Sequence, residues 1–97
     1  MTHVFEVTDK IGKKIHLTKE RWKHIRKKHP EVVNIEEVDE TVKNPDKITF
    51  PKLDASVSFY YKYFKHRTSP YKYLLVIVKY LNGEGYVITS YYEDKIK

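Results

Sequence analysis

The feature that most constrains the fold is the run Leu74-Leu-Val-Ile-Val78, five consecutive apolar residues inside the segment Tyr71–Tyr80. An uninterrupted apolar run of this length predicts a central β-strand that is buried on both faces. It is followed by Asn82-Gly-Glu-Gly85, which is typical of a tight hairpin turn. The next strand, Tyr86–Tyr92, should therefore return antiparallel to the first.

Four further segments have strand character. Ser56–Phe64 is rich in Tyr and Phe, and Lys47–Phe50 is a shorter candidate upstream of it. Near the N-terminus, Val4–Val7 and Lys14–Leu17 flank the turn-like stretch Asp9–Lys13, whose Gly12 tolerates a positive φ. The sequence thus predicts an N-terminal hairpin and a later meander of about four strands.

Two helices are predicted between the hairpin and the meander. Thr18 is a suitable N-cap for a helix over Lys19–Lys28, and the proline at position 30 ends it. Asn34-Ile-Glu-Glu37 matches a capping box, and the apolar residues that follow form a one-sided stripe to about Lys43.

We therefore expect a single α+β domain over residues 1–97. Its hairpin and both helices should pack on one face of a roughly four-stranded antiparallel sheet. The other face should stay partly open and carry tyrosines and basic residues.

Charge and composition limit the classes of function that the chain can have. The net charge is +6 and the pI about 9.4, which favours an anionic partner, most commonly nucleic acid. The alternative is a lysine-rich surface that only maintains solubility.

The chain has no cysteine, which excludes disulfides and thiol catalysis. No apolar run approaches the ~20 residues that span a bilayer, and the N-terminus lacks signal-peptide features. We expect a soluble, cytoplasmic protein without a membrane partner.

The segment Leu17–Glu31 carries the densest chemistry. It combines two histidines with Trp22 and five basic residues, and imidazole is the side chain best suited to proton transfer near neutral pH. At 100° per residue, His29 shares an arc with Trp22 and should lie near the core edge or the sheet. His24 should face solvent on the more basic side. For His29 the alternative is a helix-terminal histidine that stabilises the helix end.

Further candidates come from the strands. Thr89 and Tyr91 should share a strand face with Val87, and Ser90 should point the other way. Tyr91 could donate to a phosphate or stack on a base, and the alternative is half-buried packing. For Thr89 the alternative is a β-branched strand former. Tyrosines interleaved with lysines resemble a stacking surface for single-stranded RNA, which only one face of the strand can supply. The residues predicted to bind RNA are Arg21, Lys28, Tyr60, Lys62, Arg67 and Lys79. His24 and His29 are five residues apart, on different helix faces, so no metal site or cofactor is expected.

The ordered motifs resemble those of the phage-associated branch of the barnase–EndoU–colicin–RelE-like nucleases (the BECR fold). The motifs are Ile15-His-Leu-Thr-Lys-Glu-Arg-Trp22, His24-Ile25, His29-Pro30-Glu31, Val38-Asp-Glu-Thr-Val-Lys-Asn-Pro-Asp-Lys-Ile48, Tyr73-Leu-Leu-Val-Ile-Val-Lys79, Tyr86-Val-Ile-Thr-Ser-Tyr91 and Asp94-Lys-Ile-Lys97. Together they cover nearly the whole chain in the right order.

The resemblance implies a metal-independent endoribonuclease, derived from a toxin or a phage, in which the 2′-hydroxyl attacks the adjacent phosphate. It implies a catalytic histidine in the helical region, His24 or His29, with Thr89 or Ser90 and Tyr91 in the last strand. RNA is then the partner, together with an antitoxin or immunity protein, and the chain acts as a monomer or a dimer. Two alternatives remain: a non-catalytic RNA- or DNA-binding module on the same fold, and a protein-interaction domain.

Overall fold

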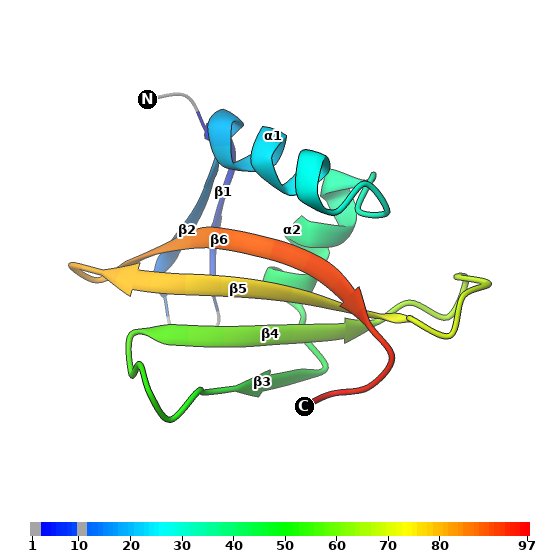
Figure 1. Ribbon diagram of the computed structural model, residues 1–97. Coiled ribbons are helices and arrows are strands. Elements are labelled where there is room, and N and C mark those ends of the chain that lie inside the picture. The colour runs from blue at the N-terminus through cyan, green and yellow to red at the C-terminus, as the bar shows by residue number, and fades with distance from the viewer. Residues whose placement is uncertain (1–2, 10–11) are drawn as a thin grey trace.

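The computed structural model describes residues 3–9 and 12–97. Its elements are β1 (His3–Thr8), β2 (Lys14–Thr18), α1 (Lys19–Lys28), α2 (Ile35–Lys43), β3 (Lys47–Thr49), β4 (Val57–Tyr63), β5 (Tyr73–Leu81) and β6 (Glu84–Glu93) (Figure 1). The predicted α+β class and the order of its elements are confirmed. No helix in the described ranges is long and apolar enough to cross a membrane. Of the predicted Asp9–Lys13 turn, Lys10 and Ile11 lie outside the described residues.

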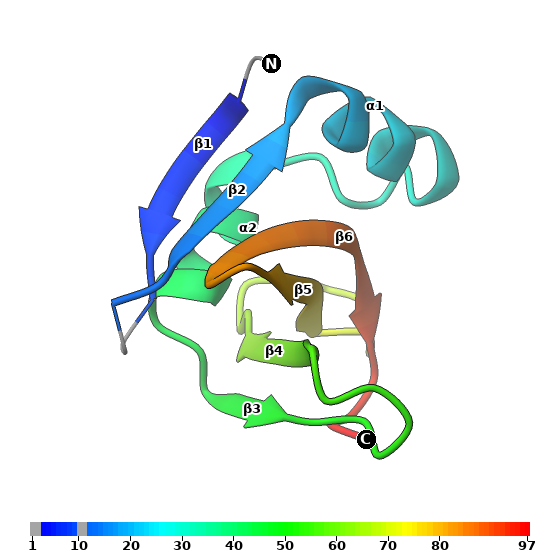
Figure 2. The same cartoon turned by 90° about the vertical axis from the view of Figure 1, so that its left-hand side faces the viewer.

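The sheet has six strands in the order β1-β2-β6-β5-β4-β3. The meander from β3 to β6 forms by successive antiparallel pairing, as predicted. The four-stranded prediction was nevertheless incomplete, because the N-terminal hairpin does not pack on the face of the meander. Instead β2 pairs in parallel with β6, through Ile15 opposite Gly85 and His16 opposite Tyr86. The sheet is therefore mixed, and it curves around α2 (Figure 2).

Gly85 explains why the hairpin can join here. The turn that precedes β6 is formed by Asn82 and Gly83, whose φ angles are 53° and 83°, whereas Gly85 lies within β6. A Cβ on Gly85 would lie 2.9 Å from side-chain atoms of both Tyr80 and Val78, and 3.2 Å from Ile15. The missing side chain thus leaves room for β2 to approach the edge of the meander.

Both helices begin at the predicted caps. The Thr18 hydroxyl accepts a hydrogen bond from the Arg21 backbone N–H, and the Asn34 side chain accepts one from Glu36. The carboxylate of Glu37, predicted to complete the capping box, is bound to Tyr92 and His66 instead. The helix starts were therefore predicted correctly, but the Glu37 carboxylate makes tertiary contacts in place of the predicted capping contact.

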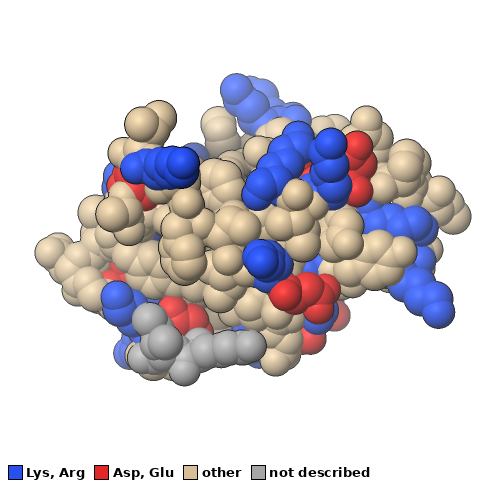
Figure 3. Space-filling model, turned by 90° about the horizontal axis from the view of Figure 1, so that it is seen from below, with Lys and Arg blue, Asp and Glu red and all other residues tan. Residues whose placement is uncertain are grey.

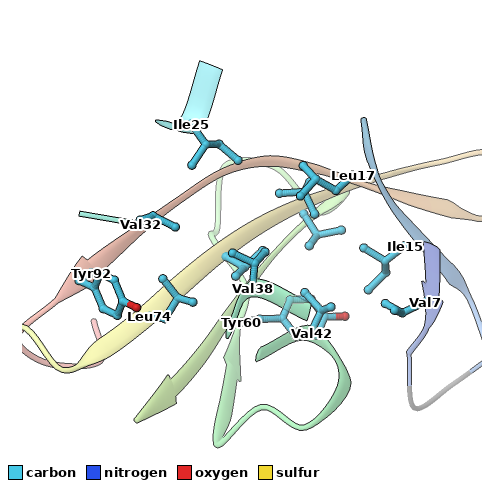
Figure 4. Packing of buried hydrophobic residues seen from close by; sticks show 13 residues of the cluster. Val7, Ile15, Leu17, Ile25, Val32, Val38, Val42, Tyr60, Leu74 and Tyr92 are labelled. Carbon is cyan, nitrogen blue, oxygen red and sulfur yellow. The ribbon is translucent and has the colours of Figure 1, made fainter. Parts of the chain in front are cut away.

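The core lies between the helices and one face of the sheet (Figure 4). Ile25 is the one buried residue of α1, whereas α2 buries Val38, Thr41 and Val42. The central run of β5 is buried as predicted, apart from the partly exposed Ile77. The apolar residues of the core cluster are Val7, Ile15, Leu17, Ile25, Val32, Val38, Val42, Tyr60, Leu74, Val76, Val78, Val87 and Tyr92.

The sheet face opposite the helices is only partly open. Tyr61 and Leu75 pair on this face and are each 1% exposed. Tyr63 is exposed and Tyr73 is partly exposed, near the end of the face. The C-terminal segment crosses this side of the sheet towards β3 (Figure 1). The expected surface of tyrosines is therefore smaller than the alternation along β4 predicted.

Candidate functional site

A β-bulge in β6 determines which way the candidate residues of this strand face. Ile77 pairs with Thr89, but the next residue, Val78, pairs with Val87, so Ile88 is the extra residue. Thr89 and Tyr91 share a face, as predicted, but it is not the face of Val87. Simple alternation failed here because a bulge shifts every later side chain to the other face.

His29 meets Tyr91 where α1 ends. His29 is the C-cap residue of α1, and its backbone N–H donates to the Ile25 carbonyl. Its ring stacks on the Tyr91 ring, with 4.9 Å between centroids and 27° between planes. Its Nδ1 lies 3.8 Å from a carboxylate oxygen of Glu31, and the side chain is 30% exposed. This imidazole is therefore held in place by its neighbours while remaining accessible to solvent.

The environment of Tyr91 keeps its hydroxyl protonated. Burial raises the pKa of Tyr91, and the neighbouring Glu93 and Tyr61 raise it further, while Lys97 acts in the opposite direction. At neutral pH the phenol is therefore a hydrogen-bond donor. His29, whose imidazole can transfer a proton, therefore lies beside Tyr91, whose neutral phenol can donate a hydrogen bond.

His24 lies elsewhere on α1. Its side chain is exposed and lines a shallow surface hollow together with Thr18, Glu20 and Arg21. No contact between His24 and the His29–Tyr91 pair is found among the described residues. The two histidines therefore do not act as one pair, and of the two it is His29 that contacts a candidate residue of β6, Tyr91.

The predicted RNA-binding residues divide into three groups: accessible residues of α1, one core residue, and cations that already have partners within the chain. Lys28 is exposed and Arg21 partly exposed on α1. Tyr60, by contrast, is 4% exposed and belongs to the core. Its prediction as a stacking platform was wrong because the face of β4 that carries Tyr60 is the face covered by α2.

Three further predicted RNA-binding side chains are occupied by partners within the chain. Lys62 donates to the backbone carbonyl of Asn44, and Lys79 pairs with Asp54 at 3.2 Å. Arg67 lies over the Tyr92 ring, 3.5 Å from its centroid, and donates to the Tyr71 carbonyl. These three cations stabilise loops, and a phosphate would have to compete with the existing contacts.

The sequence did not indicate the groove beside His29. Glu31, Arg67, Ser69, Tyr71 and Tyr92 line a surface pocket of about 290 Å³. Its lining residues come from the connection after α1, from the loop between β4 and β5, and from β6. That loop lies at the right-hand end of Figure 1. Glu31 lies beside His29 and also lines the pocket, so the pocket adjoins the His29–Tyr91 pair. Of its lining residues, Arg67 alone had been selected from the sequence for RNA binding.

A neighbouring cluster fixes this loop to α2. Glu37 accepts a hydrogen bond from the Tyr92 hydroxyl and lies 3.1 Å from His66 Nε2. Burial and this hydrogen bond raise the pKa of Tyr92. Adjacent tyrosines of β6 thus contact different helical segments: Tyr91 contacts the end of α1 and Tyr92 contacts α2.

Positive charge is concentrated on α1. The helix carries six Lys or Arg residues and a single Glu. In the described part of the chain, no ion pair joins these cations to a carboxylate. On the face viewed from below, opposite α1, acidic and basic side chains are interspersed and most of the surface is uncharged (Figure 3). An anionic polymer would therefore meet its strongest attraction along α1 and at the end that carries His29.

Comparisons with known proteins leave the site to be judged on its geometry. No family model, no curated protein and no solved structure matches the chain. Within residues 3–9 and 12–97, no group of three or more His, Asp or Glu side chains is arranged to hold a metal ion. The groups that the candidate site brings together are the His29 imidazole, the Tyr91 phenol and the Glu31 carboxylate.

Proposed function

We propose that this protein is a metal-independent endoribonuclease in which His29 transfers the proton. The observation that carries this proposal is the stacking of His29 on Tyr91, at the exposed end of a basic helix. The ordered resemblance to the barnase–EndoU–colicin–RelE-like nucleases supports the same reaction. We place the activity in the cytoplasm, where RNA would be the substrate.

The proposed reaction uses the groups in sequence. RNA lies along α1, where cations such as Arg21 and Lys28 hold its phosphates. His29 accepts the proton of the 2′-hydroxyl as the 2′ oxygen forms a bond to phosphorus. Tyr91 donates a hydrogen bond to a non-bridging phosphate oxygen, where negative charge develops, and Thr89 on the same face supplies a second hydroxyl. The bond to the 5′ oxygen then breaks, that oxygen takes a proton from water, and His29 gives its proton to the hydroxide that remains. The products are a 2′,3′-cyclic phosphate and a 5′-hydroxyl.

Glu31 has a positioning role in this scheme. Its carboxylate lies 3.8 Å from His29 Nδ1, close enough to favour the tautomer that carries its proton on that nitrogen. The other nitrogen, Nε2, is then the base. Glu31→Gln should therefore lower the cleavage rate and shift its pH profile, whereas a purely structural role would leave the profile in place.

The two histidines of α1 provide a matched test. Purified protein is incubated with a mixed tRNA and mRNA pool in excess EDTA, and His29→Ala is compared with His24→Ala. Loss of a general base should slow cleavage by His29→Ala about 10²- to 10⁴-fold, whereas His24→Ala should retain most of the activity. Cleavage that requires a metal, or that depends on His24 alone, would contradict the assignment.

The charge on α1 also favours a second function, a non-catalytic RNA-binding module. Its cations have no carboxylate partners among the described residues and need no histidine to bind RNA. Salt-sensitive RNA binding without cleavage, unchanged in His29→Ala, would establish this function in place of the nuclease.

A further inference from the structure

A second pocket lies at the opposite end of the sheet from His29. Its volume is about 310 Å³, and it opens between the C-terminal end of α2, β3 and the loop that follows β3. Val42, Pro45, Ile48 and Phe50 form its apolar walls, and Tyr60 and Tyr80 are its aromatic hydroxyl groups. A concave, mostly apolar site with a few convergent polar groups is the usual form of a small-molecule site.

The polar side of this pocket is a directed chain of hydrogen bonds. The Tyr80 hydroxyl donates to the carboxylate of Asp9 at 2.9 Å, so the hydrogen between the two tyrosines comes from Tyr60. Burial raises the pKa of both tyrosines, so both stay neutral at neutral pH. A phenol that donates its only hydrogen keeps acceptor capacity on its oxygen. Tyr60 therefore presents an acceptor, not a donor, to a molecule in the pocket.

We propose that this pocket binds a small, neutral aromatic molecule that carries an O–H or N–H donor. The ring would pack between the apolar walls, and its donor would bind the Tyr60 oxygen. The proposal does not depend on the nuclease activity, because the pocket shares no lining residue with the groove beside His29.

Two observations favour this class of ligand over others. Phe50, at the pocket wall, is 68% exposed, so a bound aromatic ring would remove part of its surface from water. Asp9 and Lys13 both line the polar side, and the Lys13 ammonium lies 5.3 Å from the centroid of the Tyr80 ring, so opposite charges there offset each other and favour a neutral ligand. A neutral ring with a single donor satisfies both the walls and the hydrogen-bond chain.

Indole and benzothiophene test the proposal, because they share a shape but only indole has an N–H donor. We expect both to shift backbone amide resonances around the pocket in a saturable way, with indole binding more tightly. Tyr60→Phe should weaken indole about three- to tenfold, the range that one neutral hydrogen bond contributes. The same change should leave benzothiophene binding unaltered. Ala55→Trp should abolish binding of both, because Ala55 lines the pocket on an exposed loop.

Leu53→Trp is the matched control, since Leu53 lies on the same loop, is fully exposed and does not line the pocket. It should bind both probes like the unaltered protein, and thermal unfolding should show that each variant is folded. The absence of saturable shifts with either probe would overturn the site. Full binding by Ala55→Trp would place the ligand elsewhere. Equal weakening of both probes by Tyr60→Phe would refute the role of the donor.

Discussion

The two helices are of similar length but make different contributions to the molecule. α1 buries only Ile25 and carries six cations, whereas α2 buries three residues and carries four acidic residues. α1 ends at His29, which stacks on Tyr91, while α2 is bound through Glu37 to Tyr92. The comparison indicates that α2 holds the fold together and that α1 provides the exposed, charged surface on which the proposed chemistry depends.

The largest effect on stability is expected in α2. Val38 is fully buried, and Val38→Ala removes two methyl groups and leaves a cavity, at a cost of about 2 kcal/mol in the free energy of unfolding. Urea unfolding measures the change, with the exposed Glu36→Ala as the control. If Val38→Ala cost no more than Glu36→Ala, α2 would not be the structural helix.

The hydrogen bond between Tyr92 and Glu37 should have the next largest effect. Tyr92→Phe removes a hydrogen bond to a charged group, which costs about 1.5 kcal/mol at neutral pH.

The same bond predicts a pH dependence. Because the pKa of Tyr92 is raised in the folded state, its stabilising contribution is complete below pH about 10, the ordinary tyrosine value. It is lost as the pH rises above that value. The alkaline decline in stability should therefore be shallower in Tyr92→Phe, and it should be unchanged in Tyr71→Phe, whose side chain is exposed.

Removal of an N-cap should reduce hydrogen-exchange protection more in the first turn of α1 than in that of α2, although the cost in global stability should be similar. Thr18→Ala should cost about 1 kcal/mol of stability, and a similar global cost is expected for Asn34→Ala. Amide hydrogen exchange should differ: the first turn of α1 should lose protection, because one buried residue holds that helix, whereas α2 should stay protected. Equal fraying of both helices would remove the distinction between them.

The smallest effect on stability, with the clearest effect on binding, is expected from the cations of α1. Lys27→Glu with Lys28→Glu should change stability by less than about 0.5 kcal/mol, because both side chains are exposed. RNA affinity should fall, and the slope of log affinity against log salt should decrease by about 0.7 for each phosphate that the helix no longer neutralises. Lys47→Glu with Lys52→Glu makes the same change in net charge away from α1. An equal fall in affinity in that control would show that only net charge matters.

Local patterns predicted the elements closely. Thr18 and Asn34 begin the helices as expected, and Asn82-Gly83 forms the predicted turn. Such signals depend on neighbouring residues, so they can be recognised without knowledge of the fold. The parallel pairing of β2 with β6 has no such signal, because it depends on how Gly85 accommodates Tyr80 and Ile15 from elsewhere in the chain.

The candidate site shows the same division. His29 and Tyr91 were both selected from the sequence, but their stacking depends on a bulge in β6 and on where α1 crosses the sheet. Tyr60 was selected for its residue type and is buried. The groove beside Glu31 joins a loop more than thirty residues away, so periodicity could not reveal it.

The sequence by itself determined the α+β class, the ends of the helices, the central strand and the concentration of positive charge on α1. These follow from backbone preferences, apolar periodicity and formal charge, all of which are properties of neighbouring residues. Only the tertiary structure decided which histidine meets a strand tyrosine, which cations are bound within the chain and where the two pockets lie. Those outcomes depend on the packing of side chains that are distant in the sequence, and a single bulge or glycine is enough to change them.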